Sequence, residues 1–222
     1  MVGAMGVPRG RWAVRMEAAL TTREQPARHG DGHDAGELAS VVARAAAGDE
    51  RAWETLVSIY SRRVYAMAKS RLRRPDLAEE ITQSVFVTIA TKLRDNAYTE
   101  QGRFEAWLFR VTMNRVRDAA RRMKRQAVAM EPSAIAAMGA EASAAGDPAD
   151  LGALRAALGT LGDADREVIE LRHHGQLGFK EIAEMLGEPL GTVLARHHRA
   201  LRKLRGVLER HDPDENGKDG LA

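Results

Sequence analysis

Apolar residues recur every three or four positions along most of the chain between Gly36 and Arg210, and this spacing predicts amphipathic α-helices. No segment alternates apolar and polar residues with the period of two that a half-buried strand requires. The pattern therefore predicts an all-α protein. Two of the predicted stripes contain Trp53, Leu56, Val57, Tyr60, Val64 and Met67, and then Leu77, Ile81, Val85, Ile89 and Leu93.

Residues that favour helix ends mark the boundaries of these segments. Gly48 is expected to end one helix, and Asp49 is expected to cap the next. Pro75 suits the first turn of a third helix, because an N–H at that position has no partner within the helix. Asp163 is expected to cap a helix nearer the C-terminus.

A polar loop at 95–102 precedes a helix with two unlike faces at 103–125. The apolar side of this helix is predicted to contain Phe104, Trp107, Leu108 and Val111. The opposite side is basic, because cationic residues recur there at steps of seven, seven, four and three, which return to one face of a helix. These residues are Arg103, Arg110, Arg117, Arg121 and Lys124.

The stretch at 151–210 contains only helical patterns, separated by glycines. A first helix carries Val168, Ile169 and Leu171 and should stop near Gly175. A short helix, a turn at Gly187 to Gly191 and a long helix with surface Arg follow, which is the outline of a helix-turn-helix. The predicted apolar residues of these last two helices are Ile182, Ala183 and Leu186, and then Val193, Leu201, Leu204 and Leu208.

Composition divides the chain into five parts. The first is a leader of Gly, Pro, Arg and His without helical periodicity, which is expected to be disordered. Two small helical domains then follow, joined by a flexible, Ala-rich, acidic linker, and the chain ends in an acidic tail. The boundaries are 1–35 for the leader, 36–125 for the first domain, 126–150 for the linker, 151–210 for the second domain and 211–222 for the tail.

Length and composition exclude several classes of protein. The 222 residues suffice for one medium domain or two small ones, and 44% hydrophobic residues can bury a core. There is no cysteine, which excludes a disulfide framework, a thiolate metal site and a catalytic cysteine. The longest apolar runs are far below the ~20 residues that a membrane helix needs. We therefore expect a cytoplasmic protein without membrane insertion.

The positive charge is concentrated in two predicted helices. The formal net charge of the chain is only +3, but residues 103–125 hold eight basic residues against two acidic ones, and residues 189–210 hold six against one. Residues 126–150 between them contain four acidic residues and no Lys or Arg. Each basic helix can follow a phosphate backbone. The alternative on charge alone is a pair of solvated helix faces.

Two long stretches resemble the extracytoplasmic-function (ECF) group of the bacterial sigma-70 family. The family's region two is similar to "DERAWETLVSIYSRRVYAMAKSRLRRPDLAEEITQSVFVTIATKL" at 49–93, continued by "GRFEAWLFRVTMNRVRDAARRMKR" at 102–125. Its region four is similar to "LGDADREVIELRHHGQLGFKEIAEMLGEPLGTVLARHHRALRKLR" at 161–205. The two stretches cover about two thirds of the chain in the family's order, which makes the resemblance specific.

This resemblance implies a protein that binds core RNA polymerase and directs it to promoters. Region two would recognise and melt the minus-ten element, and region four would read the minus-thirty-five element. The helix "LAEEITQSVF" aligns with the surface that docks on the clamp helices of the polymerase beta-prime subunit. The implied contacts there are Glu79, Glu80, Gln83 and Phe86, with the alternative that Phe86 is core and the two Glu are charges at a helix start.

For region two, the resemblance places capture of a flipped minus-ten base at the loop 95–102, where Asn96 offers an amide and Tyr98 a ring. Trp107 and Phe104 are expected in the core, because their spacing matches that of Leu108 and Val111. The implied phosphate contacts are Arg103, Arg110, Asn114, Arg117 and Arg121.

For region four, "PLGTV" opens the recognition helix, whose N-terminal half should enter the major groove. Arg196 is the expected base reader, because a guanidinium can bond guanine in two places. Leu194 and Ala195 depart from the family, in which a polar or basic residue commonly follows "TV". The full set of expected DNA contacts is Lys180, Thr192, Arg196, Arg199 and Lys203.

Three other functions are weaker alternatives. A metal site at the histidines is disfavoured, because adjacent histidines on a helix point apart and no HExxH-type motif is present. No catalytic motif is visible, so we expect neither an enzyme nor a cofactor. A stand-alone helix-turn-helix regulator would need a dimer interface, for which no heptad seam is visible, and it would leave the basic helix at 103–125 and the segment "LAEEITQSVF" without a role. An interaction scaffold with incidental basic faces is weaker still. The histidines of the disfavoured metal site are His173, His174, His197 and His198.

The resemblance also implies an anti-sigma factor as a partner.

Overall fold

A computed structural model describes residues 35–99, 102–129 and 149–210 of the chain. The predicted leader, most of the linker and the tail lie outside these residues. Within the described ranges all regular structure is α-helical, which confirms the predicted fold class. No helix among these residues is long and apolar enough to cross a membrane. The contacts divide the chain into two units, Met1–Asp118 and Ala119–Ala222.

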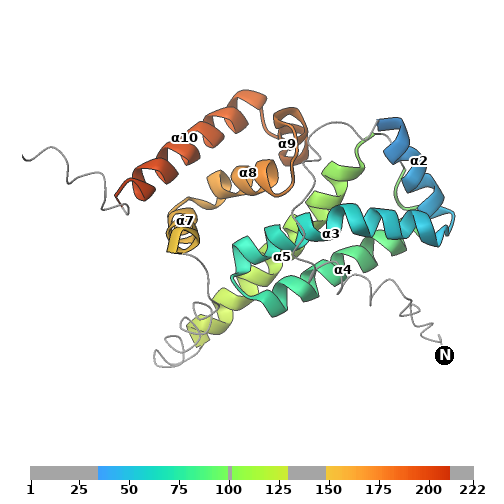
Figure 1. Ribbon diagram of the computed structural model, residues 1–222, viewed down its shortest axis with the longest axis horizontal. Coiled ribbons are helices and arrows are strands. Elements are labelled where there is room, and N and C mark those ends of the chain that lie inside the picture. The colour runs from blue at the N-terminus through green and yellow to red at the C-terminus, as the bar shows by residue number, and fades with distance from the viewer. Residues whose placement is uncertain (1–34, 100–101, 130–148, 211–222) are drawn as a thin grey trace, which may run out of the picture. The chain divides into compact units, whose positions relative to one another are not determined.

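The first unit is built on a helical hairpin. Helices α3 and α4 pack side by side, and α2 contacts both of them (Figure 1). Helix α5 begins in this unit and continues past the division between the units. The bounds are Ala35–Ala46 for α2, Glu50–Leu72 for α3, Pro75–Arg94 for α4 and Phe104–Ala129 for α5.

The predicted helix ends are confirmed at the hairpin. The Asp49 carboxylate accepts hydrogen bonds from the backbone N–H groups of Arg51 and Ala52, which caps α3. Gly48 before it has φ 91°, a left-handed conformation that glycine adopts without steric cost. Pro75 opens α4 as expected. The sequence therefore places the two long helices of this unit correctly.

The core of the first unit largely follows the predicted stripes. Tyr60 lies between two rings of α5, with centroid distances of 5.6 Å to Phe104 and 6.5 Å to Phe109. Phe109, which the sequence analysis missed, is fully buried, whereas Trp107 and Val111 are only half-buried. The predicted apolar side of α5 is therefore wrong for Val111 and in part for Trp107. The buried face turns through Phe104, Leu108, Phe109, Met113 and Val116 instead.

The second unit contains the predicted helix-turn-helix. Helix α10 packs on α7, α8 and α9, and its buried side holds Val193, Ala200 and Leu204 (Figure 1). Leu201 was expected beside them but is 41% exposed, because it lies about 100° around the helix from Ala200. The bounds are Ala149–Gly159 for α7, Asp163–His173 for α8, Phe179–Leu186 for α9 and Leu190–Leu208 for α10.

Two helix starts in this unit differ from the prediction. The N-cap of α8 is Gly162, so Asp163 lies in the first turn and does not cap the helix. The turn before α10 is shorter than expected, because α10 already begins at Leu190. Gly187 ends α9 at φ 68° and provides the sharp change of direction. The helix-turn-helix is therefore present, with a tighter turn than the glycine spacing suggested.

Candidate nucleic-acid interface

One side of α5 presents cations around an indole ring. Trp107 follows Arg103 by four residues and precedes Arg110 by three, so the three side chains leave the helix in similar directions. Arg103 and Arg110 are exposed. Further along this face Asn114 and Arg121 are exposed, and the Arg117 guanidinium donates to the Asn114 side-chain oxygen at 3.4 Å. The structure therefore brings the five predicted polar residues of α5 together on one surface.

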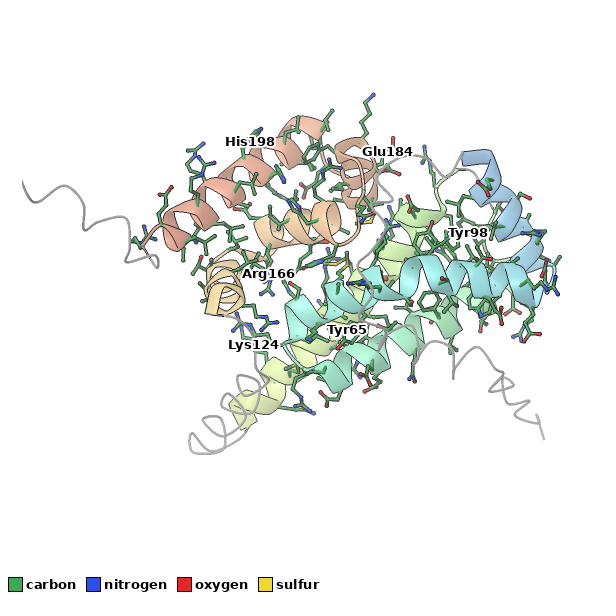
Figure 2. The ribbon with its side chains drawn as sticks, in the orientation of Figure 1. Tyr65, Tyr98, Lys124, Arg166, Glu184 and His198 are labelled. Carbon is green, nitrogen blue, oxygen red and sulfur yellow. The ribbon has the colours of Figure 1, made fainter. Side chains whose placement is uncertain are left out.

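The predicted base-capture loop meets this surface through aromatic stacking. The half-buried Tyr98 ring stacks on Trp107 with 4.1 Å between centroids and 19° between planes. Phe104 contacts both rings edge-on, at 6.0 Å from Tyr98 and 5.9 Å from Trp107. Figure 2 labels Tyr98 at this position in the first unit. The sequence analysis named Tyr98 but assigned Trp107 to the core, so it missed the stack.

Asn96 lies just after α4 in a left-handed conformation with φ 50°. Asparagine tolerates this conformation better than most residues do. The turn is held by the backbone, because the Ala97 N–H donates to the Lys92 carbonyl at 2.9 Å. The Asn96 side chain is exposed, next to the segment that carries Tyr98.

An anchor beneath this face fixes the start of α5 against α3. Arg63 donates to the Glu105 carboxylate at 2.7 Å, and its guanidinium lies 4.9 Å from the Phe109 ring centroid and 5.1 Å from that of Tyr60. The Arg63 side chain is largely buried by these contacts. A buried guanidinium between two rings and a carboxylate gains both ion pairing and cation–π attraction. These contacts hold the start of α5 in place against α3.

The predicted polymerase contacts on α4 differ in their exposure. Glu79, Glu80 and Gln83 are exposed, whereas Phe86 is fully buried and packs edge-on against Trp53 at 6.1 Å. The expectation that Phe86 touches a partner is therefore wrong, because an apolar ring with no accessible surface belongs to the core. Burial, and secondly the charge of Glu79, raise the pKa of Tyr65.

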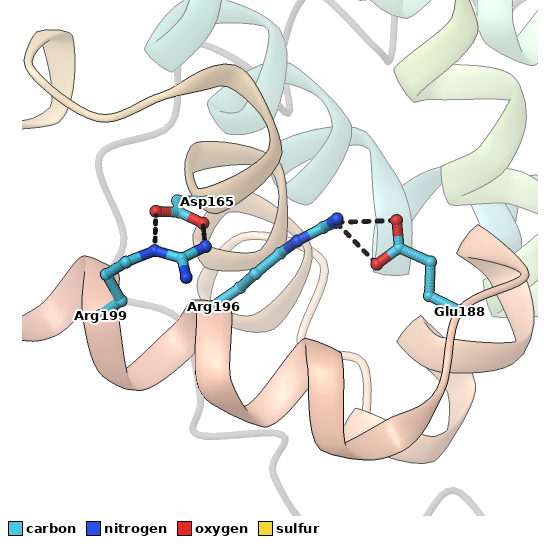
Figure 3. Close-up of polar contacts among 4 residues, drawn as sticks. All are labelled: Asp165, Glu188, Arg196 and Arg199. Atoms are coloured by element: carbon cyan, nitrogen blue, oxygen red, sulfur yellow. Dashed lines mark hydrogen bonds and ion pairs between the residues drawn. The ribbon is translucent and has the colours of Figure 1, made fainter.

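In the second unit, the predicted basic face of α10 is engaged within the unit itself. Arg196 pairs with Glu188 at 2.7 Å, and Arg199 forms two hydrogen bonds with Asp165 at 2.5 and 2.8 Å (Figure 3). Lys203 donates to the Thr160 carbonyl. The hydrogen bond from Arg199 is the largest of the effects that lower the pKa of Asp165. These cations are therefore held by partners within the unit, although Arg199 and Lys203 stay exposed, and a second exposed stripe lies beside them.

The outward stripe of α10 repeats at steps of four, three and four. Ala195, His198 and Arg202 are exposed along it, starting from Gly191. Figure 2 shows His198 on the side of α10 that faces away from α8. A hollow of about 350 Å³ follows this stripe and is lined by His198, Leu201, Arg202 and Arg205. The sequence contains this period, but the predicted DNA contacts were assigned to the neighbouring stripe with Arg196 and Arg199. Lys180 is exposed at the start of α9, as predicted.

Three of the four histidines, His173, His197 and His198, have their rings near one another. His173 and His197 stack with 5.8 Å between centroids, and Phe179 lies edge-on to His197 at 4.9 Å. Burial is the first cause that lowers the pKa of His173 and that of His197. Among the residues that the structure describes, no group of three or more His, Asp or Glu is arranged to hold a metal ion.

Comparison with known proteins identifies both units. Residues 56–126 match the family model for sigma-70 region 2, and residues 157–206 match the model for sigma-70 region 4. Over 181 residues the chain is 33% identical to an ECF RNA polymerase sigma factor, SigE, of Mycolicibacterium smegmatis, which covers 76% of this chain and 67% of that relative. The chain belongs to the ECF family of RNA polymerase sigma factors. SigW of Bacillus subtilis is 28% identical over 72% of this chain and 91% of SigW.

Solved structures agree with this family. The structure of CnrH in complex with the cytosolic domain of CnrY aligns with a TM-score of 0.58 and 27% identity, covering 81% of this chain and all of the other. The sigma factor RpoE of Bartonella quintana, solved with the anti-sigma factor NepR, aligns with a TM-score of 0.55 over 70% of this chain and 96% of RpoE. At 21% identity, RpoE supports the fold alone.

As an ECF sigma factor, the protein binds core RNA polymerase and directs it to promoters. Region 2 recognises and melts the minus-ten element, and region 4 reads the minus-thirty-five element. Sigma factors are not enzymes, so the alternative of a catalytic protein does not fit the family. The alternative function of a stand-alone helix-turn-helix regulator is also rejected, because a chain with region 2 as well as region 4 acts through polymerase.

Proposed function

We propose that this sigma factor melts promoter DNA on the face of α5 that carries Trp107. The observation that supports this most strongly is the Tyr98–Trp107 stack beside a row of cations. Unpaired bases need aromatic rings to stack on and cations to hold their phosphates. Asn96 supplies an amide for the edge of a captured base. The phosphate contacts in this proposal are Arg103, Arg110, Asn114, Arg117 and Arg121.

The polymerase-binding surface in this proposal is the exposed acidic part of α4. Glu79, Glu80 and Gln83 offer carboxylates and an amide to a basic partner helix, for which the family suggests the clamp helices of the beta-prime subunit. Phe86 supports this surface from below, since it is fully buried.

In region 4, the N-terminal half of α10 enters the major groove. The outward residues Ala195, His198 and Arg202 face the bases, and Arg199 and Lys180 hold phosphates on either side. Base readout by Arg196 stays a prediction, and it requires that the ion pair with Glu188 opens. Thr192 and Lys203 complete the predicted set, each half-buried or engaged within the unit.

The wider setting is proposed on the same grounds. The two domains at 36–125 and 151–210 work as separate DNA-binding modules joined by the segment 126–150, in the cytoplasm where polymerase transcribes. CnrH, at 27% identity, is held by the cytosolic domain of another protein. We infer that an anti-sigma factor with a cytosolic domain binds this chain in the same manner.

Run-off transcription with purified core polymerase on fragmented genomic DNA of the source organism tests the function. The expected result is a set of discrete transcripts whose promoters share two spaced elements. Glu79→Lys combined with Glu80→Lys should reduce capture of core polymerase, since a basic partner helix would be repelled. The matched control is Glu37→Lys combined with Glu50→Lys, at exposed positions of α2 and α3. Transcripts and polymerase capture that survive the double variant would place the polymerase surface elsewhere.

A further inference from the structure

Asp165 and Arg199 form the best-aligned ion pair on the recognition helix. Asp165 lies in the first turn of α8, and its two oxygens accept from Nε and Nη2 of Arg199 at 2.8 and 2.5 Å (Figure 3). The two partners differ in exposure: 61% of the Arg199 side chain is accessible, against 15% for Asp165. The guanidinium is therefore within reach of a ligand from solvent while the carboxylate holds it from behind.

More than one cation acts on the Asp165 carboxylate. Arg196 and Lys203 also contribute, after Arg199, to the lowered pKa of Asp165. The three cations lie at successive turns of one side of α10. Among these three cations Asp165 contacts Arg199 directly, whereas Arg196 pairs with Glu188.

A phosphate diester presents the same chemistry as this carboxylate. Both offer two oxygens to the planar fork of a guanidinium, and both form short charge-assisted hydrogen bonds with it. Asp165 occupies the Nε and Nη2 edge of Arg199, so it uses two of the five N–H donors of the guanidinium. A DNA phosphate that takes this same edge must therefore compete with Asp165.

We propose that in the free protein Asp165 occupies the place on Arg199 that a backbone phosphate takes in the promoter complex, and that Asp165 thereby limits the affinity of region 4 for DNA. The inference rests on the proposed function, in which α10 contacts DNA. Because phosphates carry no sequence information, the restraint acts on promoter and unrelated duplexes alike.

The test uses the full chain assembled with core polymerase and measures the dissociation constant of a promoter duplex and an unrelated duplex against salt concentration. Asp165→Asn keeps the shape and removes the charge, and it should tighten binding to both duplexes by about three- to tenfold at low salt. Asp165→Glu, which keeps a carboxylate, should bind as the unaltered protein does. The matched charge control is Glu209→Gln at the exposed C-terminal end of α10.

The tighter DNA binding expected of Asp165→Asn requires the Arg199 guanidinium. Asp165→Asn should therefore give no tightening in an Arg199→Gln background, although Arg199→Gln alone weakens binding. Unchanged or weaker binding of Asp165→Asn, or a gain that persists without Arg199, would overturn the inference. Melting temperatures establish that the variants fold, and Asp165→Ser replaces Asp165→Asn if the latter does not.

Two further variants test the proposed function itself, that α10 contacts promoter DNA. Arg202→Gln and His198→Ala alter the outward stripe of α10 and should weaken promoter binding. If neither has an effect, the proposed DNA-facing side of α10 is wrong. If both weaken binding while Asp165→Asn changes nothing, only the role of Asp165 is wrong.

Discussion

The Tyr98 ring lies nearly parallel to the Trp107 indole, 4.1 Å away between centroids, at the end of a cationic helix face. Each ring is half-buried, so the stack is part of the surface of the first unit. A base that leaves the duplex loses its own stacking partners and can recover them only on such a ring. The pair therefore joins the loop after α4 to the cationic face of α5, where the proposed function places the melted DNA.

Removal of the Tyr98 ring should impair promoter melting. Tyr98→Ala is expected to cost ~1 to 3 kcal/mol in open-complex stability, which is the usual worth of one base–aromatic stack. Permanganate reactivity of thymines in the minus-ten element measures the melted fraction. Tyr98→Phe keeps the ring and should melt the promoter as the unaltered protein does. Equal melting by Tyr98→Ala would show that the stack has only a structural role.

Arg117 should contribute affinity without selectivity. Its guanidinium lies on the α5 face beside Asn114, where phosphate contacts are expected. Arg117→Ala is expected to weaken binding evenly across promoter sequences and to reduce the slope of log affinity against log salt by about one. Binding of labelled promoters to the holoenzyme at several salt concentrations measures this slope. A change confined to one promoter sequence would instead indicate base readout.

Helical spacing was sufficient to predict the helices and most of the core, because a 3.6-residue period records which side of a helix is buried. The spacing did not predict correctly which of two adjacent apolar residues is buried. Leu201 is exposed because Ala200 takes the buried position, and Phe109 is buried although Leu108 already fills the predicted stripe. Where two apolar residues are adjacent, or one of them is small, packing against other helices decides which side chain is buried.

The site was predicted less completely, because ion pairs join residues that are far apart in sequence. Nothing near Arg199 indicates that Asp165, 34 residues earlier, will bind it. The α5 face needed only one helix and was predicted well, whereas the outward side of α10 depends on how α8 and α9 cover the helix. Trp107 was misplaced for a similar reason, since its partner Tyr98 comes from a loop.

Acid should destabilise region 4 through the stacked His173 and His197. In the folded protein burial, and after it the charges of His173, His198 and Arg172, keep the pKa of His197 below its usual 6.5. Burial, followed by the charge of Arg172, lowers the pKa of His173 as well. The unfolded chain regains the usual value, so it binds more protons than the folded chain as the pH falls below 6.5. The stability contributed by the neutral pair is therefore complete above that pH and is lost as the pH falls towards the lower, folded values.

Thermal unfolding of the chain between pH 8 and pH 5 measures this effect. His197→Leu should reduce the pH dependence, and it also removes a ring nitrogen, Nε2, that is buried without a hydrogen-bond partner in the structure. Such a group costs ~1 to 3 kcal/mol, so the variant should be more stable than the unaltered protein at pH 6. An unchanged pH profile in His197→Leu would exclude the stacked pair as the source.

The ion pair of Arg196 with Glu188 allows base readout to be separated from a positioning role. Arg196 lies on α10 and Glu188 in the turn before it, at 2.7 Å, and only 21% of the Arg196 side chain is exposed. If Arg196 reads a base, Arg196→Ala should cost ~1 to 3 kcal/mol on the promoter and relax selectivity at one upstream base pair. Dissociation constants on promoters with single substitutions measure both effects.

Exchange of the two charges decides between the roles. Base readout requires a guanidinium at position 196, so Arg196→Glu combined with Glu188→Arg should bind no better than Arg196→Glu alone. A positioning role requires only that the turn and the helix stay joined, and the exchanged pair would then restore promoter binding. We expect the exchange to fail. Restored binding with unchanged base selectivity would make Arg196 a positioning residue and leave readout to the outward stripe of His198 and Arg202.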